Sequence, residues 1–245
     1  VNTVGVCGMS ENSLIIFGDY PLASCNSVCY NEKDLVLKEP PVTIIAALKE
    51  SENSLLIAGD SQVGESGGLI LHPKIKMHRH LSANIAWGYS GNDTIGADKF
   101  TPWLESLDVS TLSWDELEDK AIRKLSELNG KQRKLIKLSG VNEDRNDTTD
   151  CLLVGYLDRF GIYELDNRGK ATPYLENEFH AIGSGKPFAW TAYKALKVAQ
   201  CLTGLGMMKA IMHTVVTTSN ECGSPVYIWR VSRDGITKGL WEDER

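Results

Sequence analysis

The stretch that decides the fold is Thr43–Asp60, which reads TIIAALKESENSLLIAGD. It consists of an apolar run, a polar Ser-Glu-Asn-Ser turn at 51–54, and a second apolar run that ends in Gly-Asp. Two short apolar runs separated by a polar turn are typical of a β-hairpin. The hairpin would bring Thr43, at the start of the first strand, to the same end of the sheet as Asp60, at the end of the second.

The hairpin pattern occurs a second time, nearer the start of the sequence. Ser10–Asp19 (SENSLIIFGD) matches Ser51–Asp60 (SENSLLIAGD) at eight of ten positions, at an offset of 41. Such self-similarity indicates a duplicated structural unit. The copies are joined through Lys38-Glu39-Pro40-Pro41, whose paired prolines favour an extended connector. The sequence therefore predicts an N-terminal extension, 1–42, ahead of a single domain, 43–245.

The composition excludes several classes of protein. The chain has 26 Lys and Arg against 32 Asp and Glu, a net charge of −6. Nucleic-acid binding requires a basic face, so this balance predicts no nucleic-acid partner. The sequence has no run of 18 apolar residues and no signal-peptide pattern at its start, which predicts a cytoplasmic protein with no membrane partner. Cys25 and Cys29 have no matched partner ligands. His78 and His80 would share one strand face and could bind a metal, but the pattern favours a basic, exposed strand end, so no metal site is expected.

Beyond the hairpin, the pattern predicts an α+β chain in which helices cover the sheets. Further strands are predicted at Leu69–Leu71, Ile75–His78, Asn84–Tyr89, Cys151–Leu157, Gly161–Leu165, Phe179–Ile182 and Val226–Val231. Helices are predicted at Thr94–Leu107, with a break near Pro102, and at Trp114–Leu138, Lys186–Gln200 and Met207–Thr217. In the second helix, Ser113 and Glu116 have the spacing of a capping box, and Leu117, Ile122, Leu125, Leu128 and Leu135 form the apolar face. A polar loop is predicted at 142–147.

Polar residues at the ends of the apolar strands are the candidates for chemistry. Asp60 ends the second strand of the hairpin, Thr43 begins the first, and Lys76 follows Asp60 after 16 residues. A carboxylate and an ammonium can assist proton transfer from a threonine hydroxyl, and a free α-amine can act as its base. On the residues alone, a structural Asp–Lys pair at a sheet edge remains the other interpretation.

Three blocks of the sequence resemble the proteasome β subunits, and they are closer still to the bacterial ring peptidase HslV. The blocks are Thr43–Ala47 with Leu56–Gln62 and Lys74–Lys76, then Trp87–Gly91 (WGYSG), and then Ala181–Ala189 (AIGSGKPFA). In addition, Cys222-Gly223 precedes a predicted strand where proteasome subunits carry a Gly-rich loop. The first and third of these blocks carry most of the resemblance.

The resemblance implies the four-layer αββα sandwich of the N-terminal-nucleophile (Ntn) hydrolases, here with an extra N-terminal β-hairpin segment. It implies threonine-type hydrolysis of peptide bonds within a homo-oligomeric ring, with peptides or unfolded proteins as substrates and an ATPase or unfoldase as partner. Carried over residue by residue, it assigns Thr43 as the nucleophile, Asp60 and Lys76 as the groups that orient and activate it, and Ser184 as a supporting hydroxyl. No cofactor is implied, because this reaction needs only protein groups and water.

The sequence departs from the family at the nucleophile. Thr43 follows Pro41-Val42, whereas self-processing members usually present Gly before the Thr, so activity would depend on freeing the N-terminus of Thr43. Members often begin Thr-Thr-Ile, which leaves Val42 as an alternative occupant of the nucleophile position. Trimming two residues would instead make Thr3 terminal. The alternative function is a catalytically inactive structural or assembly subunit of the same fold, as in the α-type proteasome subunits.

Overall fold

The computed structural model describes residues 43–65, 68–71, 75–79, 83–91, 95–139, 148–174, 179–200, 202–219 and 222–241. From 62 to 79 the description covers the backbone alone. The first copy of the repeat at Ser10–Asp19, the alternative nucleophile positions Thr3 and Val42, and the predicted loop at 142–147 lie outside the described residues.

The described residues form a mixed α+β structure with two five-stranded antiparallel sheets. The first sheet has the order β10-β1-β2-β11-β12, and the second has the order β5-β6-β7-β8-β9. The strands of the first sheet are β1 (Ile45–Ser51), β2 (Ser54–Gly59), β10 (Phe179–Ile182), β11 (Val226–Ser232) and β12 (Gly235–Trp241). Those of the second are β5 (Ile75–Arg79), β6 (Asn84–Gly91), β7 (Thr149–Tyr156), β8 (Phe160–Leu165) and β9 (Ala171–Pro173). The strands β3 (Gln62–Glu65) and β4 (Gly68–Leu71) form a separate two-stranded hairpin.

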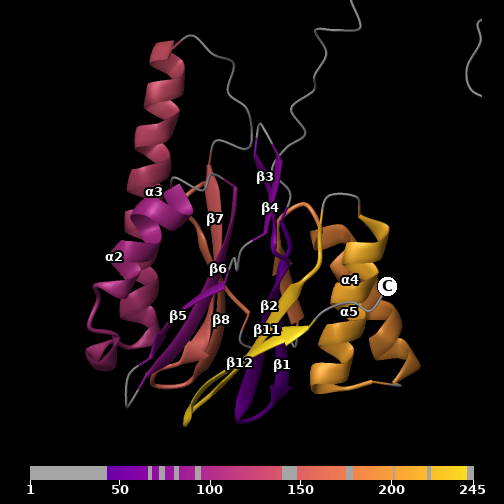
Figure 1. Ribbon diagram of the computed structural model, residues 1–245. Coiled ribbons are helices and arrows are strands. Elements are labelled where there is room, and N and C mark those ends of the chain that lie inside the picture. The colour runs from indigo at the N-terminus through magenta and orange to yellow at the C-terminus, as the bar shows by residue number, and fades with distance from the viewer. Residues whose placement is uncertain are drawn as a thin grey trace, which may run out of the picture. The chain divides into compact units, whose positions relative to one another are not determined.

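Helices flank both five-stranded sheets (Figure 1). The second sheet packs against α2 (Thr101–Glu105) and α3 (Trp114–Ser139), and the first packs against α4 (Lys186–Ala199) and α5 (Gly204–Thr218). A π-helical turn, η1 (Gly96–Phe100), leads into α2, and a 3-10 turn, η2 (Val109–Thr111), precedes α3. In the part of the chain that the structure describes, none of the helices combines the length and the apolar character needed to cross a membrane.

The hairpin predicted at Thr43–Asp60 is present as β1 and β2. The two strands pair from Ile45 opposite Gly59, and the register shifts between Lys49 and Ser51. From Ile44, just before β1, the side chains alternate between two buried faces. Ile44, Ala46 and Leu48 belong to the core with α4 and α5, and Ile45 and Ala47 belong to the core between the two sheets. A strand that is buried on both faces needs apolar residues at every position, which explains the continuous apolar run.

Most of the predicted elements are present, although their bounds differ and three strands were not predicted. The strands that the pattern missed are β3, β9 and β12. The last of these contains Gly235 and Gly239, which weaken the apolar alternation that signals a strand. The helix predicted to begin at Met207 begins at Gly204, because tertiary packing overrides the low helix propensity of the glycines there.

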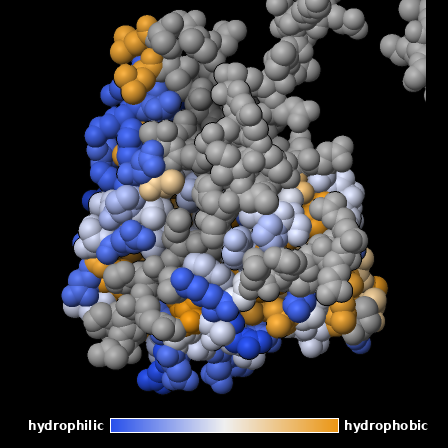
Figure 2. Space-filling view, in the orientation of Figure 1, coloured by the Kyte–Doolittle hydropathy of each residue, from blue (hydrophilic) through white to orange (hydrophobic). Residues whose placement is uncertain are grey.

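The helix α3 begins as predicted and extends further than its apolar face. The capping box is formed: the Ser113 main-chain N–H donates to Glu116 Oε2 at 2.9 Å, and the Glu116 N–H donates to Ser113 Oγ at 3.3 Å. The prediction that Leu135 belongs to the buried face is wrong, since it is 60% exposed. A helix of 26 residues is about 39 Å long, whereas an eight-residue strand spans about 27 Å, so the end of α3 has no sheet to cover. Hydrophobic surface is visible at this end of α3 in Figure 2.

Candidate active site

Thr43, Asp60 and Ser184 lie together at one end of the first sheet. The Thr43 main-chain N–H donates to Ser184 Oγ at 3.4 Å, and the next amide, that of Ile44, donates to Asp60 Oδ1 at 3.1 Å. The Asp60 N–H in turn donates to the Ile44 carbonyl at 3.2 Å. The structure therefore brings together three of the four residues singled out in the sequence.

Asp60 ties the start of β1 to the loop before β11. Its side chain is fully buried, and its second oxygen, Oδ2, accepts from the Gly223 N–H at 3.3 Å. The following residue, Ser61, donates its N–H to the Gly223 carbonyl at 3.4 Å. Both oxygens of this carboxylate thus satisfy main-chain amides that burial removes from water, which makes Asp60 an anchor as well as a candidate catalytic group.

The turn that carries Ser184 fits only with glycine on each side of it. Gly183 has a φ of 92°, and a Cβ placed there would lie 2.0 Å from the Thr43 carbonyl oxygen. A Cβ at Gly185 would lie 2.9 Å from Cβ of Ile44 and 3.0 Å from Cys222 Sγ. The Gly185 N–H also donates to the Thr43 carbonyl at 3.4 Å. The Gly-Ser-Gly sequence is therefore what allows Ser184 to approach Thr43.

Gly183→Ala is expected to lower the free energy of unfolding by about 2 kcal/mol or more. Left-handed backbone costs an alanine roughly 1–2 kcal/mol, and the overlap with the Thr43 carbonyl adds to that cost. Urea unfolding measures the change. The control is Gly130→Ala within α3, where an added Cβ meets open space and should stabilise the helix by roughly 0.5–1 kcal/mol. Equal effects of the two substitutions would contradict this account of the turn.

The fourth predicted residue, Lys76, lies in the second sheet. Its backbone is in β5, opposite Trp87 of β6, and its side chain is outside the described part. The adjacent pair is Ile75 with Gly88, and a Cβ at Gly88 would lie 2.7 Å from the Ile45 side chain. The backbone of Lys76 is therefore one residue pair away from the point where the second sheet contacts β1.

A buried polar cluster, which the sequence did not reveal, adjoins the Ser184 turn. His180 of β10 is 2% exposed, and its Nε2 lies 2.7 Å from Glu164 Oε2. The Tyr174 hydroxyl donates to the same oxygen at 3.0 Å, and Lys186 Nζ lies 3.6 Å from Glu164 Oε1. The only local signals were a Glu and a His within otherwise apolar strands. We name Glu164, Tyr174, His180 and Lys186 the Glu164 cluster.

The Glu164 cluster holds its carboxylate in the charged form. Burial raises the pKa of Glu164, but the hydrogen bond and the charge of His180, together with Lys186 and Tyr174, outweigh burial and lower this pKa to about 2. Burial and the hydrogen bond to this carboxylate raise the pKa of Tyr174 to about 12. The Glu164 carboxylate therefore stays ionised, as an acceptor, at neutral pH.

This lowered pKa predicts acid-sensitive stability. Because the pKa of Glu164 in the folded state is below that in the unfolded state, its contribution is complete above about pH 5 and is lost as the pH falls towards 2. The full contribution is of order 3 kcal/mol. Unfolding of the parent chain and of Glu164→Gln, compared from pH 7 to pH 2.5, should show a gap that closes over this range. The control is Glu118→Gln: burial and Asp115 raise the pKa of Glu118, so any gap there should have the opposite sign, with the variant more stable than the parent at pH 7. A gap for Glu164→Gln that is independent of pH would contradict the assignment.

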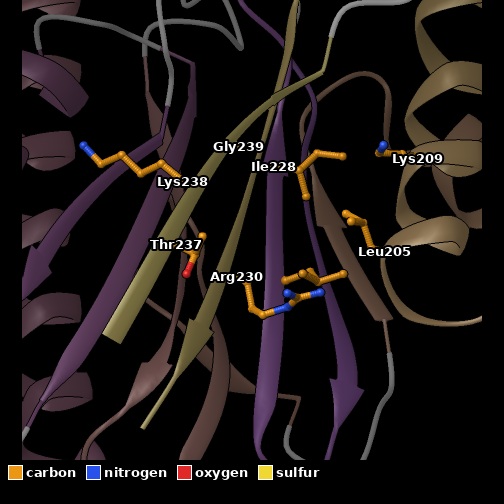
Figure 3. Close-up of a pocket in the computed structure, with 8 residues that line it drawn as sticks. Leu205, Lys209, Ile228, Arg230, Thr237, Lys238 and Gly239 are labelled. Carbon is orange, nitrogen blue, oxygen red and sulfur yellow. The ribbon is translucent and has the colours of Figure 1, made fainter. Parts of the chain in front are cut away.

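A pocket lies between α5 and the strands β11 and β12 (Figure 3). Its volume is about 180 Å³, and its lining residues are Leu56, Leu205, Lys209, Ile228, Arg230, Thr237, Lys238 and Gly239. Arg230 is held by Glu50, near the turn of the β1–β2 hairpin, with N–O distances of 2.5 and 2.6 Å. The pocket therefore lies towards the end of the hairpin opposite to Thr43.

The described residues contain no group of three or more His, Cys, Asp or Glu side chains arranged to hold a metal ion. The residues considered for metal binding in the sequence, Cys25, Cys29 and His80 together with the side chain of His78, fall outside the described part.

Comparison with known proteins identifies relatives by structure only. No protein-family model and no curated protein matches the chain. Among solved structures, the chain is similar to Anbu from Pseudomonas aeruginosa in a helical assembly, with a TM-score of 0.63 and 13% identity over 82% of this chain and 88% of that one. Anbu (ancestral β-subunit) from Yersinia bercovieri has a TM-score of 0.62 and 12% identity over the same shares. Eukaryotic HslV from Trypanosoma brucei has a TM-score of 0.54 and 16% identity over 77% of this chain and 99% of that one.

At these identities the likeness concerns the fold. It confirms, at that level, the resemblance to HslV and proteasome-like subunits, which the sequence blocks indicated.

Proposed function

We propose that the chain is a proteasome/HslV-like subunit that hydrolyses peptide bonds with Thr43 as its nucleophile. In this proposal, residues 43–245 form one domain with the four-layer αββα sandwich of the Ntn hydrolases, and removal of residues 1–42 frees the α-amine. The observation that carries the proposal is the 3.4 Å contact between the Thr43 nitrogen and Ser184 Oγ, in a fold similar to Anbu and HslV. The same nitrogen becomes the α-amine when the bond after Val42 is cleaved.

The hydrogen bonds favour Thr43 over its neighbour as the nucleophile. Asp60 accepts a hydrogen bond from the Ile44 N–H, and Ser184 accepts one from the Thr43 N–H. Thr43 is therefore the residue that lies between the two predicted partners. Val42 has no hydroxyl, and Thr3 belongs to the segment that the proposal removes. The register at the start of β1 therefore supports the assignment of Thr43.

The proposed reaction uses the chain's own groups. The free amine of Thr43 takes the proton of its hydroxyl, and the hydroxyl oxygen attacks the peptide carbonyl. The resulting ammonium gives this proton to the leaving amine as the C–N bond breaks, which leaves an acyl-enzyme. Water, deprotonated by the same amine, then cleaves the ester, and the proton returns to the Thr43 oxygen. Asp60 keeps the start of β1 in position, and Ser184 holds the amine from the opposite side. We assign to Lys76 the ammonium that lowers the cost of developing charge on the hydroxyl oxygen.

Lys76→Ala is expected to lower kcat for peptide hydrolysis by about 100-fold or more, because a positioned ammonium in the reaction typically contributes this much. The matched control is Lys74→Ala, which removes the same side chain two residues earlier in the chain. Steady-state kinetics on both variants measures the difference. A larger loss of kcat in Lys74→Ala than in Lys76→Ala would contradict this assignment and indicate that Lys74 supplies the ammonium.

The second candidate function is a catalytically inactive assembly subunit of the same fold. It is favoured by the bond that joins Thr43 to Val42 in this sequence and by the 6% exposure of Thr43, which leaves the hydroxyl little access to a substrate. In both functions we propose a homo-oligomeric ring, with an ATPase or unfoldase as the partner that delivers protein substrates. Light scattering that shows only a 27.0 kDa species would contradict the ring.

A covalent inhibitor directed at N-terminal threonine tests which function holds. The purified full chain is incubated with the inhibitor, and peptide mapping by mass spectrometry locates the adduct. An adduct on Thr43 with loss of peptidase activity supports the enzyme. An unlabelled chain that lacks activity supports the assembly subunit, and an adduct on Thr3 would contradict the assignment of Thr43.

A further inference from the structure

Glu164 contacts the chain on both sides of the Ser184 turn. His180, four residues before Ser184, places Nε2 2.7 Å from Glu164 Oε2, and Lys186, two residues after it, places Nζ 3.6 Å from Glu164 Oε1. The carboxylate belongs to β8 of the second sheet, whereas the turn connects β10 of the first sheet to α4. The Glu164 side chain, in the second sheet, therefore contacts residues on both sides of the Ser184 turn, which follows a strand of the first sheet.

The His180 ring, which contacts Glu164, is tightly packed. The ring of Tyr174 is stacked on His180 with centroids 3.6 Å apart, and Trp190 of α4 lies edge-on at 6.2 Å. Burial and the nearby Glu164 carboxylate raise the pKa of Asp150, whose Oδ1 accepts from the Asn167 N–H at 2.6 Å. With its ring confined on these sides, His180 has little freedom to leave the Glu164 carboxylate.

Main-chain hydrogen bonds hold the turn: the Gly185 N–H donates to the Thr43 carbonyl at 3.4 Å, and the Lys186 N–H donates to the Gly183 carbonyl at 3.1 Å. Two of its three residues are glycines, which lose more conformational entropy on ordering than other residues, and Ser184 is exposed to solvent. The hydrogen bond that the Thr43 N–H donates to Ser184 Oγ depends on the position in which this turn is held. The two charge-assisted contacts of Glu164 add side-chain restraints on both sides of the turn.

We propose that Glu164, His180 and Lys186 are positioning residues, which hold the Gly183–Gly185 turn so that Ser184 Oγ stays in contact with the Thr43 nitrogen. The catalytic consequence rests on the proposed function, whereas the restraint on the turn does not. Loss of the Glu164 carboxylate should therefore loosen the turn in any state of the chain, and slow the reaction of Thr43 wherever the chain is active.

Amide hydrogen exchange, read by NMR on the full chain, tests the restraint without any need for activity. The probe is the Gly185 amide, which donates to the Thr43 carbonyl. Glu164→Ala should speed its exchange by about tenfold or more, as the loss of a charge-assisted hydrogen bond predicts. The matched control is Glu50→Ala, since Glu50 is 15% exposed against 16% for Glu164 and is also ion-paired, with Arg230. It should change exchange at Gly185 by no more than about twofold. Equal effects of the two substitutions would overturn the proposal.

A second pair of variants covers failure of Glu164→Ala to fold. Lys186→Met removes the partner that is 39% exposed and keeps the contact between His180 and Glu164, so it should speed exchange at Gly185 about threefold. Glu164→Gln keeps an acceptor for His180 and should restore most of the protection. No increase in Lys186→Met, or no recovery in Glu164→Gln, would overturn the proposal.

The catalytic consequence has its own readout. In Lys186→Met, the maximal rate of Thr43 labelling by the covalent inhibitor should fall by about threefold to tenfold, while the inhibitor concentration for half-maximal rate stays unchanged. A merely structural role would change neither parameter in the folded protein. If the parent chain is never labelled, the proposed function fails, and exchange at Gly185 alone decides the positioning role.

Discussion

Thr43→Ala is expected to abolish peptide hydrolysis, with kcat/KM lower by about four orders of magnitude or more. The hydroxyl is the only group at the site that the proposed reaction uses to form the acyl-enzyme, and loss of a nucleophile in comparable mechanisms has an effect of this size. Because Thr43 also supplies the α-amine that acts as base, alanine would keep the base and lose the group on which it acts. Hydrolysis of a fluorogenic peptide measures the change.

Thr43→Ser is the matched control for this prediction. Serine keeps the hydroxyl, the α-amine and the main-chain contacts with Ser184 and Gly185, so it should retain activity within about 100-fold of the parent. The alanine variant should unfold at the same urea concentration as the parent within about 1 kcal/mol, because it leaves the main chain unchanged. Peptidase activity that survives in the alanine variant would exclude Thr43 as the nucleophile.

Asp60→Ala is expected to be the most destabilising single substitution at the site, lowering the free energy of unfolding by about 3–5 kcal/mol. The carboxylate is fully buried and accepts the Ile44 and Gly223 amides, so its loss leaves two buried N–H groups without an acceptor at roughly 1–3 kcal/mol each. Urea unfolding at pH 7 measures the effect. The peptidase activity should be lost as well, since the start of β1 loses the bond that keeps Thr43 in position.

Two further variants separate this prediction from the general cost of removing an aspartate. Asp60→Asn keeps one acceptor oxygen and should recover about half of the lost stability. Asp108→Ala removes a carboxylate that accepts a main-chain amide, that of Ser110, at an exposed position, and should cost less than about 1 kcal/mol because water replaces the acceptor. Similar losses at positions 60 and 108 would contradict the role given to burial.

The sequence predicted those helices and strands that are determined by residues close together in the chain. The β1–β2 hairpin, the capping box of α3 and the helix α4 follow from neighbouring residues, and they are found close to their expected positions. The strand β12 was missed because its stability comes from pairing with β11, through a tight turn ending at Gly235, rather than from its own apolar residues. The exposure of Leu135 was missed because periodicity describes the face of a helix and not the length of the sheet beneath it.

The residues of the candidate site also differ in how far local sequence patterns predict them. Hairpin pairing alone places Thr43 and Asp60 at one end of the sheet, whereas Ser184 was identified through the resemblance, since 141 residues separate it from Thr43. The interval between Asp60 and Lys76 says nothing of the sheet that each occupies, and the structure places the two residues in different sheets. The Glu164 cluster joins several separate elements, and only tertiary structure brings them together.

The most direct test of the central claim is the N-terminus of the purified chain, measured by intact mass and N-terminal sequencing on the same sample that hydrolyses peptides. The account predicts that the active species begins at Thr43, so that the nitrogen beside Ser184 Oγ is a free amine. An active species that still carries Val42 would contradict the account, because its Thr43 would have no α-amine to act as base.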